Sequence, residues 1–225
     1  MRFHTVSLAA LAACVPFTNA ATGRSFTGWD CCKPACAWKT NLRNVQGSPK
    51  VCDINNNPLL NGLDAETGCK SNGNGYLCDT YVPVPVTETL SYGFATMGGA
   101  GNCCKCFQLT WTGGNARGKQ MVVQAINSFG DGASGEVKAN DIVILTPGGG
   151  NGPNDSGCRS QYGRNWGSSG GGVASGADCA NLPQNLQGGC YWRYNWARGS
   201  VNTWNIEYQQ VTCPSRLTSI SGCSA

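Results

Sequence analysis

Histidine is almost absent from this sequence. The 225 residues include one histidine, His4, beside fifteen cysteines. Residues 1–20 have the pattern of a secretory signal peptide, with Arg2 as a basic start, a mostly apolar stretch from Ser7 to Phe17, and small residues for cleavage at Thr18-Asn19-Ala20. The apolar stretch is shorter than the roughly 20 residues that span a bilayer. We therefore expect a secreted, extracellular protein that does not enter the membrane.

Without residues 1–20 the chain contains no histidine, and this absence excludes several kinds of catalytic site. Ser-His-Asp triads, Cys-His dyads, HExxH zinc sites and imidazole bases are all excluded. Loss of Cys14 leaves fourteen cysteines, an even number that predicts seven disulfides in an exported chain. Bridged cysteines supply neither thiolates nor zinc ligands. Carboxylates, hydroxyls, lysine and arginine remain as reactive groups, and we expect no metal and no cofactor.

Charge is also scarce, because Asp, Glu, Lys and Arg make up 12% of the chain. The formal net charge of +4 is not gathered into a basic run, so we expect no nucleic-acid partner. No repeat, linker or low-complexity block divides the chain, and cysteines extend from Cys31 to Cys223. We predict a single domain over residues 21–225 that acts as a monomer.

Strand-like segments are the clearest regular signals. The segment Cys104 to Trp111 places Phe107, Leu109 and Trp111 on one face. Three further segments predict strands: Met121 to Ile126, Ile142 to Leu145 and Thr203 to Val211. These patterns predict a small, mainly β protein, a barrel with long disulfide-tied loops.

Helical periodicity is weak, and a turn or two of helix is expected only near Leu90 to Thr96 and Asp178 to Leu186. Two glycine-rich stretches, Pro147 to Gly152 and Gly167 to Gly172, lack the GKS/T ending and the GxGxxG spacing of phosphate-binding loops. We expect both to be turns or surface loops.

Carboxylates are the main remaining source of chemistry. Hydrolysis of a glycosidic bond needs only two carboxyl groups, and seven Trp and seven Tyr could stack on sugar rings. In Trp29-Asp30-Cys31-Cys32 an acid lies between an indole and two adjacent cysteines. Adjacent cysteines do not easily bridge to each other, so each should reach a different loop and make the backbone at Asp30 rigid. Such a carboxylate suits catalysis; the alternative is that Asp30 only caps a turn.

These residues also carry a family resemblance. The segment Trp29 to Pro34, with Cys36 and Trp38, is similar to the start of the fungal catalytic domains of glycoside hydrolase family 45, which are secreted endo-β-1,4-glucanases. The resemblance continues in the family order through five further motifs. These are Cys103-Cys104-Lys105-Cys106, Gly118 to Gln124, Pro147-Gly148-Gly149-Gly150, Gly189 to Arg193 and Gln210 to Pro214.

The resemblance implies a six-stranded double-psi β-barrel with a long groove for a β-1,4-glucan and few short helices. It also implies inverting hydrolysis with Asp30 as the general base and Asp155, five residues beyond Gly150, as the general acid. Asp141 is the candidate for an assisting acid, because it is the only acid shortly before Pro147. No linker or carbohydrate-binding module is expected after Cys223.

Further residues of the same motifs are candidates for substrate binding. Trp29 and Trp38 are either sugar platforms or core residues, and Lys33 either bonds sugar hydroxyls or braces its motif. The polar, glycine-rich stretch Phe129 to Asn140 fits a flap over the groove.

The chain departs from the family pattern at three points. Phe26-Thr27-Gly28 stands where the family usually has Thr-Arg-Tyr, so the tyrosine beside the base is missing. One extra residue, Ser156, follows Asp155, and Asp141 lies six residues before Pro147 in place of the usual four. In addition, Asn154-Asp155-Ser156 is an N-x-S glycosylation sequon that we expect to be unused, because a glycan would crowd the cleft.

Two alternatives to the enzyme remain. A non-hydrolytic, expansin-like wall-loosening or carbohydrate-binding protein shares the barrel but typically lacks the base, so Asp30 favours the enzyme while the loss of tyrosine at Gly28 keeps this alternative open. A disulfide-rich defence or effector protein that acts by binding alone predicts no pair of acids facing one groove.

Overall fold

The structure is a computed structural model that describes residues 20–130 and 136–225. The predicted signal peptide, residues 1–20, therefore lies almost entirely outside the described residues. No helix in the described part of the chain is long and apolar enough to cross a membrane.

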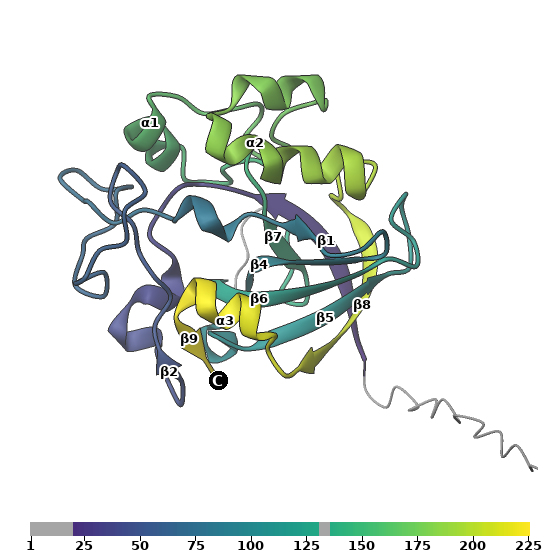
Figure 1. The fold of residues 1–225 in the computed structure, drawn as a ribbon, viewed down its shortest axis with the longest axis horizontal. Coiled ribbons are helices and arrows are strands. Elements are labelled where there is room, and N and C mark those ends of the chain that lie inside the picture. The colour runs from purple at the N-terminus through teal and green to yellow at the C-terminus, as the bar shows by residue number, and fades with distance from the viewer. Residues whose placement is uncertain (1–19, 131–135) are drawn as a thin grey trace, which may run out of the picture.

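Six strands close into a barrel in the order β4, β6, β5, β8, β1, β7, and β7 pairs back onto β4 (Figure 1). These strands are β1 (Ala21–Gly28), β4 (Leu90–Gly98), β5 (Cys106–Trp111), β6 (Gln120–Phe129), β7 (Ile142–Leu145) and β8 (Trp204–Val211). The short β3 (Val84–Pro85) extends the sheet beside β4, and β2 (Gln46–Gly47) pairs separately with β9 (Cys223–Ser224).

Two of the barrel pairings are parallel, β1 with β7 and β4 with β6, and the others are antiparallel. The two parallel pairs meet where β4 crosses β7, at Ala95 opposite Ile144 and Thr96 opposite Val143. The predicted six-stranded double-psi β-barrel is confirmed, and no edge of the barrel is left open at this junction.

The barrel is filled by side chains that the alternating pattern predicted. Phe107, Leu109 and Trp111 of β5 are buried on one face, while the residues between them are partly exposed. Ile206 of β8 and Met121 of β6 join the same cluster. All four predicted strands are present. Burial alternates with period two in β5, whereas β6 and β7 are buried over most of their length and were predicted from their runs of β-branched and apolar residues.

Two strands differ from the sequence-based expectation. The prediction of helical turns over Leu90 to Thr96 is wrong, because these residues form β4. Burial along β4 alternates through Ser91, Gly93, Ala95 and Met97, but most of these residues are small or polar, so no alternation of hydrophobic residues marks the strand in the sequence. The strand β1 was not predicted; its Arg24 and Ser25 are polar residues in a barrel strand whose partners lie far away in the sequence.

Helices are few and short, as predicted. Among the described residues, the α-helices are α1 (Ser156–Tyr162), α2 (Gln184–Tyr191) and α3 (Ser215–Ser221). The expected helical turns near Asp178 to Leu186 appear as a 3₁₀ turn at Ala177–Asn181 followed by α2. Figure 1 shows α1 and α2 together on one side of the barrel, with α3 beside β9.

Seven disulfides pair all fourteen cysteines of the described residues, which confirms the predicted framework. They join Cys31–Cys158, Cys32–Cys69, Cys36–Cys103, Cys52–Cys78, Cys104–Cys223, Cys106–Cys213 and Cys179–Cys190. The two adjacent cysteines after Asp30 reach different loops, as expected. The long loops are thereby tied to the barrel wherever its small core does not hold them.

An ion pair fixes the start of β1 to the residue before β7. The Arg24 Nη2 atom lies 2.7 Å from Oδ2 of Asp141, which is only 3% exposed. The backbone N–H groups of Arg24 and Lys138 each donate to the same carboxylate at 2.8 Å. Burial raises the pKa of Asp141, but these hydrogen bonds and the Arg24 charge outweigh it, so the net pKa lies below its ordinary value.

We predict that Asp141→Asn lowers the free energy of unfolding by about 2 kcal/mol at pH 7, because a charged acceptor is lost. Because the pKa of Asp141 is lower in the folded state than in the unfolded state, its ionised carboxylate stabilises the fold fully at pH values above about 3.9, the unfolded pKa. This stabilisation is lost as the pH falls through the folded pKa. Urea unfolding of both proteins at pH 7 and at acid pH measures this. The difference should shrink at acid pH, and an equal loss at both would contradict an ion-pair origin.

Candidate active site

The main candidate site is a hollow of about 240 Å³ that spans the crossing of β4 and β7. Its walls come from the end of β1 (residues 26–30), the end of β6 (residues 127–129), the loop after β7 (residues 150–154) and the loop residues Ser169 and Gly170. The two parallel strand pairs deliver these segments to the same place, although they are far apart in the sequence.

Asp30 follows β1 and lies in this hollow, half-buried. The backbone N–H of Trp29 donates to the Gly150 carbonyl at 2.6 Å, and the next residue, Cys31, has a left-handed φ of 61° that turns the chain away from the strand. Cys31 is bridged to Cys158. The backbone beside Asp30 is therefore held on both sides, as its motif predicted.

Two donors hold the Asp30 carboxylate. The backbone N–H of Cys32 donates to Oδ1 at 3.0 Å, and the Asn154 side-chain amide donates to Oδ2 at 3.1 Å. Burial raises the pKa of Asp30 above its ordinary value, and these hydrogen bonds offset only part of the rise. Among the described residues that line the hollow, Asp30 is the only ionisable one. A carboxylate with a raised pKa is a stronger base than an exposed one.

Asp155 lies on the neighbouring segment but is not among the lining residues. It directly precedes α1, its side chain is 70% exposed, and its Oδ2 lies 3.5 Å from Nη2 of Arg159 one turn along the helix. The segment itself is close to Asp30, because the Cα atoms of the bridged Cys31 and Cys158 are 4.9 Å apart. The structure thus brings the two segments together and leaves the Asp155 carboxylate in solvent.

Asp141 is not brought together with Asp30. It precedes β7 and pairs with Arg24, whereas Asp30 follows the opposite end of β1. A second hollow of about 570 Å³, lined also by Glu207 and Lys138, lies around this ion pair. The described contacts make Asp141 a structural partner of β1.

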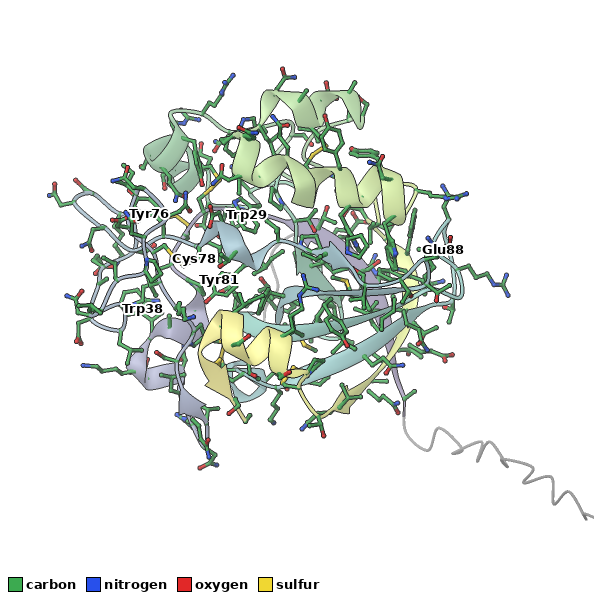
Figure 2. All side chains as sticks on the ribbon, in the orientation of Figure 1. Trp29, Trp38, Tyr76, Cys78, Tyr81 and Glu88 are labelled. Carbon is green, nitrogen blue, oxygen red and sulfur yellow. A yellow bond between two sulfur atoms is a disulfide. The ribbon has the colours of Figure 1, made fainter. Side chains whose placement is uncertain are left out.

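The predicted binding residues separate into two groups. Trp29 is 3% exposed and belongs to the core, yet it also lines the hollow, and its indole Nε1 has no hydrogen-bond partner within the described residues. Trp38 lies apart from Trp29, towards the edge of the molecule in Figure 2, and does not line the hollow.

Lys33 braces its own motif, which is one of the two roles expected from the sequence. Its ammonium group donates to the carbonyls of Leu63 at 2.9 Å and Ala65 at 2.8 Å, and it lies 3.7 Å from the centre of the Trp38 ring. Burial lowers the pKa of this buried lysine. Lys33 and Trp38 therefore stabilise the loop behind the Trp-Asp-Cys-Cys motif, outside the hollow.

Several lining residues were not identified from the sequence. The hollow includes the amides of Asn127, Asn151 and Asn154, together with Ser169 and Gly170 of a stretch expected to be only a surface loop. A hydrogen bond from the backbone N–H of Gly152 to the carbonyl of Ser169, 2.9 Å long, joins that loop to the loop after β7. The only sequence signal for Asn154 was its glycosylation sequon.

Two further expectations concern the rim of the hollow. At Gly28, where the family usually has tyrosine, an added Cβ would stand 3.0 Å from a Val143 methyl carbon. The Gly28 backbone and the Val143 side chain therefore form this part of the wall of the hollow. The predicted flap from Phe129 to Asn140 includes residues 131–135, which lie outside the described residues. Its described residues Phe129 and Val137 both line the hollow.

In the described part of the chain, no three His, Cys, Asp or Glu side chains gather around one point where they could hold a metal ion. The groups available in the hollow are one carboxylate, several amides and hydroxyls, and apolar surface. This set suits hydrogen bonding to a polar chain and one proton transfer at Asp30.

Known proteins share both the sequence and the fold. An endoglucanase of Cryptopygus antarcticus is 33% identical over 226 residues, which cover 97% of this chain and 96% of that protein. A Fusarium oxysporum protein is 38% identical over 208 residues, but this chain spans only 53% of its length. The crystal structure of a cellulase from the Antarctic springtail Cryptopygus antarcticus matches with a TM-score of 0.81 at 30% identity, covering 92% of this chain and 98% of the other.

The family comparison covers almost all of the described chain. A model for glycosyl hydrolase family 45 matches residues 22–224, a range that begins in β1 and ends in β9. It includes Asp30 and the whole barrel. The chain therefore belongs to glycosyl hydrolase family 45.

Proposed function

We propose that this chain is a secreted endoglucanase that hydrolyses internal β-1,4-glucosidic bonds of cellulose or related β-glucans with inversion. The observation that carries the proposal is Asp30, the only ionisable residue among the described residues lining the hollow, held beside Trp29. Family membership and the endoglucanases of Cryptopygus antarcticus and Phaedon cochleariae, the latter 37% identical over 205 residues, support this activity.

In the proposed mechanism Asp30 is the general base. Once ionised, it takes a proton from a water molecule while the water oxygen bonds to the anomeric carbon from the face opposite the leaving sugar. Asp155, the proposed general acid, gives its proton to the glycosidic oxygen as the bond to the anomeric carbon breaks. Solvent then removes the proton from Asp30 and returns one to Asp155.

Asp155 needs a bound glucan to act as proposed. Its carboxylate is exposed to solvent and lies 3.5 Å from the Arg159 guanidinium, outside the hollow. A sugar chain that covers this carboxylate would exclude water and place the glycosidic oxygen within its reach. Asp141 has no role in this mechanism, since its carboxylate is occupied by Arg24.

Export and domain organisation are part of the proposal. Seven disulfides suit an oxidising compartment outside the cell, which supports export and removal of residues 1–20. The proposed active form is a monomer of residues 21–225. The substrate partner is a β-1,4-glucan, with no nucleic-acid or membrane partner.

The expansin-like alternative has one supporting observation, the exposed position of the Asp155 carboxylate outside the hollow. Without a working acid, the same surface would bind a glucan and leave its bonds intact. Hydrolysis measurements separate the two functions directly.

We expect the purified protein to lower the viscosity of carboxymethylcellulose rapidly while few reducing ends appear, because internal cleavage shortens chains before it releases small sugars. Viscometry and a reducing-end assay on the same sample measure this. Binding to several β-glucans without any new reducing ends would favour the expansin-like alternative and refute the enzyme.

We predict that Asp30→Asn lowers kcat about 10²- to 10⁴-fold, because an amide cannot accept the proton of the attacking water. The raised pKa of Asp30 should also place the acid limb of kcat/KM above about 3.9, since activity is lost as that carboxylate is protonated. Asp64→Asn, which changes an exposed carboxylate 62% accessible to solvent, is the matched control; near-normal activity of Asp30→Asn would remove it from the mechanism.

Proton NMR of the wild-type reaction should show the α-anomer of the product first, because inversion at a β-linked carbon gives that anomer.

We predict that Asp155→Ala lowers the rate on cellulose-like substrates about 10²- to 10⁴-fold, since the leaving oxygen then departs without a proton. On 2,4-dinitrophenyl β-cellobioside, whose leaving group needs no protonation, the loss should be about tenfold or less. Rates on both substrates measure the difference. An equal loss on both would show that Asp155 is not the acid.

A further inference from the structure

We propose that Asn154 is a positioning residue for Asp30. The side-chain amide of Asn154 orients the Asp30 carboxylate for proton transfer, and it must remain unglycosylated although it belongs to an N-x-S sequon. The inference rests on the proposed function of Asp30 as the base. It extends that function to a residue outside the motif and to the modification state of the active protein.

The first observation is the geometry at the Asp30 carboxylate. One oxygen accepts from the backbone N–H of Cys32 at 3.0 Å and the other accepts from the Asn154 amide at 3.1 Å. Each carboxylate oxygen can accept about two hydrogen bonds, so both keep capacity for a water molecule. The terminal torsion of an aspartate is soft, and two donors from different segments fix the plane of the carboxylate where one would leave it able to rotate.

The second observation is that Asn154 is itself held in place. Its backbone N–H donates to the Asn151 carbonyl at 3.1 Å, and four residues later Cys158 is bridged to Cys31. Gly157, which lies between Asn154 and Cys158 in the sequence, packs so closely on the Asp30 backbone that a Cβ there would clash with the Asp30 carbonyl oxygen. The amide therefore reaches Asp30 from a segment that is covalently and sterically attached to the neighbour of Asp30.

The third observation concerns charge around Asp30. The described residues that line the hollow beside it are neutral, including Asn127 from β6, Thr96 from β4 and Ser169 from the glycine-rich loop. The charged groups on the segment packed against Asp30 are Asp155 and Arg159, and they pair with each other in solvent. The Asn154 amide is thus the one side-chain donor to this carboxylate among the described residues. It favours the ionised form that a base requires, and it opposes the effect of burial.

The fourth observation links this contact to glycosylation. Asn154-Asp155-Ser156 is an N-x-S sequon, and an N-glycan attaches to the same nitrogen that donates to Asp30. Attachment would replace one of its two hydrogens and place a sugar against the carboxylate in the hollow. The nitrogen keeps one hydrogen, but the sugar would take up the space beside the carboxylate where water and glucan must enter, so the active protein is the form with an unmodified Asn154.

The test uses three variants of the full protein. Asn154→Ala removes the amide and the sequon, Asn154→Asp keeps the shape but places a second carboxylate beside Asp30, and Ser156→Ala removes the sequon while keeping the amide. The measurements are kcat, KM, the pH dependence of kcat/KM, the melting temperature, the glycan occupancy by mass spectrometry, and the titration of the Asp30 carboxyl by carbon-13 NMR in the resting protein. The Asp30→Asn spectrum identifies the resonance.

We expect Asn154→Ala to lower kcat roughly ten- to a hundredfold with little change in KM, and to shift the acid limb and the Asp30 titration upward by about one pH unit. Asn154→Asp should shift both further upward, because a like charge opposes ionisation. Ser156→Ala should match the unmodified wild-type protein in kcat and in pH profile. The melting temperature of each variant shows whether a change in kcat or pH profile comes from loss of the fold.

Three results would overturn the proposal. One is an unchanged Asp30 titration in Asn154→Ala, a readout that needs no turnover and therefore stands even if Asp30→Asn proves active and the proposed function fails. Another is a change in KM alone, which would make Asn154 a substrate contact. The third is full glycan occupancy of Asn154 in protein with undiminished activity.

Discussion

The disulfide between Cys31 and Cys158 is the constraint on which the site depends. It joins residues 127 positions apart, and closing so long a loop in the unfolded chain is worth on the order of 5 kcal/mol. Because Cys31 follows Asp30 directly and Cys158 lies in α1, the bridge holds the end of β1 against the loop after β7. Together with the β1–β7 pairing, the bridge keeps Asp30 in contact with Asn154 and Gly157.

Buried cations perform a similar task for the loops around the hollow. Arg193 is 1% exposed, and its guanidinium donates to the carbonyls of Gly148 at 2.8 Å and Gly171 at 3.2 Å. A buried charge costs free energy unless it is hydrogen-bonded, so a displacement of either carbonyl from the Arg193 guanidinium would destabilise the fold. One side chain therefore links both glycine-rich loops, whose neighbours Gly150 and Gly170 line the hollow. Outside the hollow, Lys33 holds the loop at Leu63 and Ala65 in the same way.

Some of this organisation was predictable because it depends on local pattern. The strand β5 was found because one of its faces is buried, and Asp30 was found because its motif places it between an indole and adjacent cysteines. The strand β4 was missed because its alternate buried positions hold mostly small or polar residues, such as Ser91 and Gly93, so the sequence shows no alternation of hydrophobic residues. Ser169 was missed because nothing in a glycine-rich loop indicates what it packs against, and the Gly152 hydrogen bond that places it is a tertiary contact.

By itself, the sequence determined the kinds of chemistry that this protein can perform. Residues 21–225 contain no histidine and an even number of cysteines, so carboxylates remain as the reactive groups, and residue composition does not depend on folding. The tertiary structure alone decided where each carboxylate stands. Asp30 lies in the hollow, Asp155 beside it in solvent, and Asp141 in an ion pair with Arg24. Burial and pairing arise between segments distant in the chain, and spacing along a sequence does not contain them.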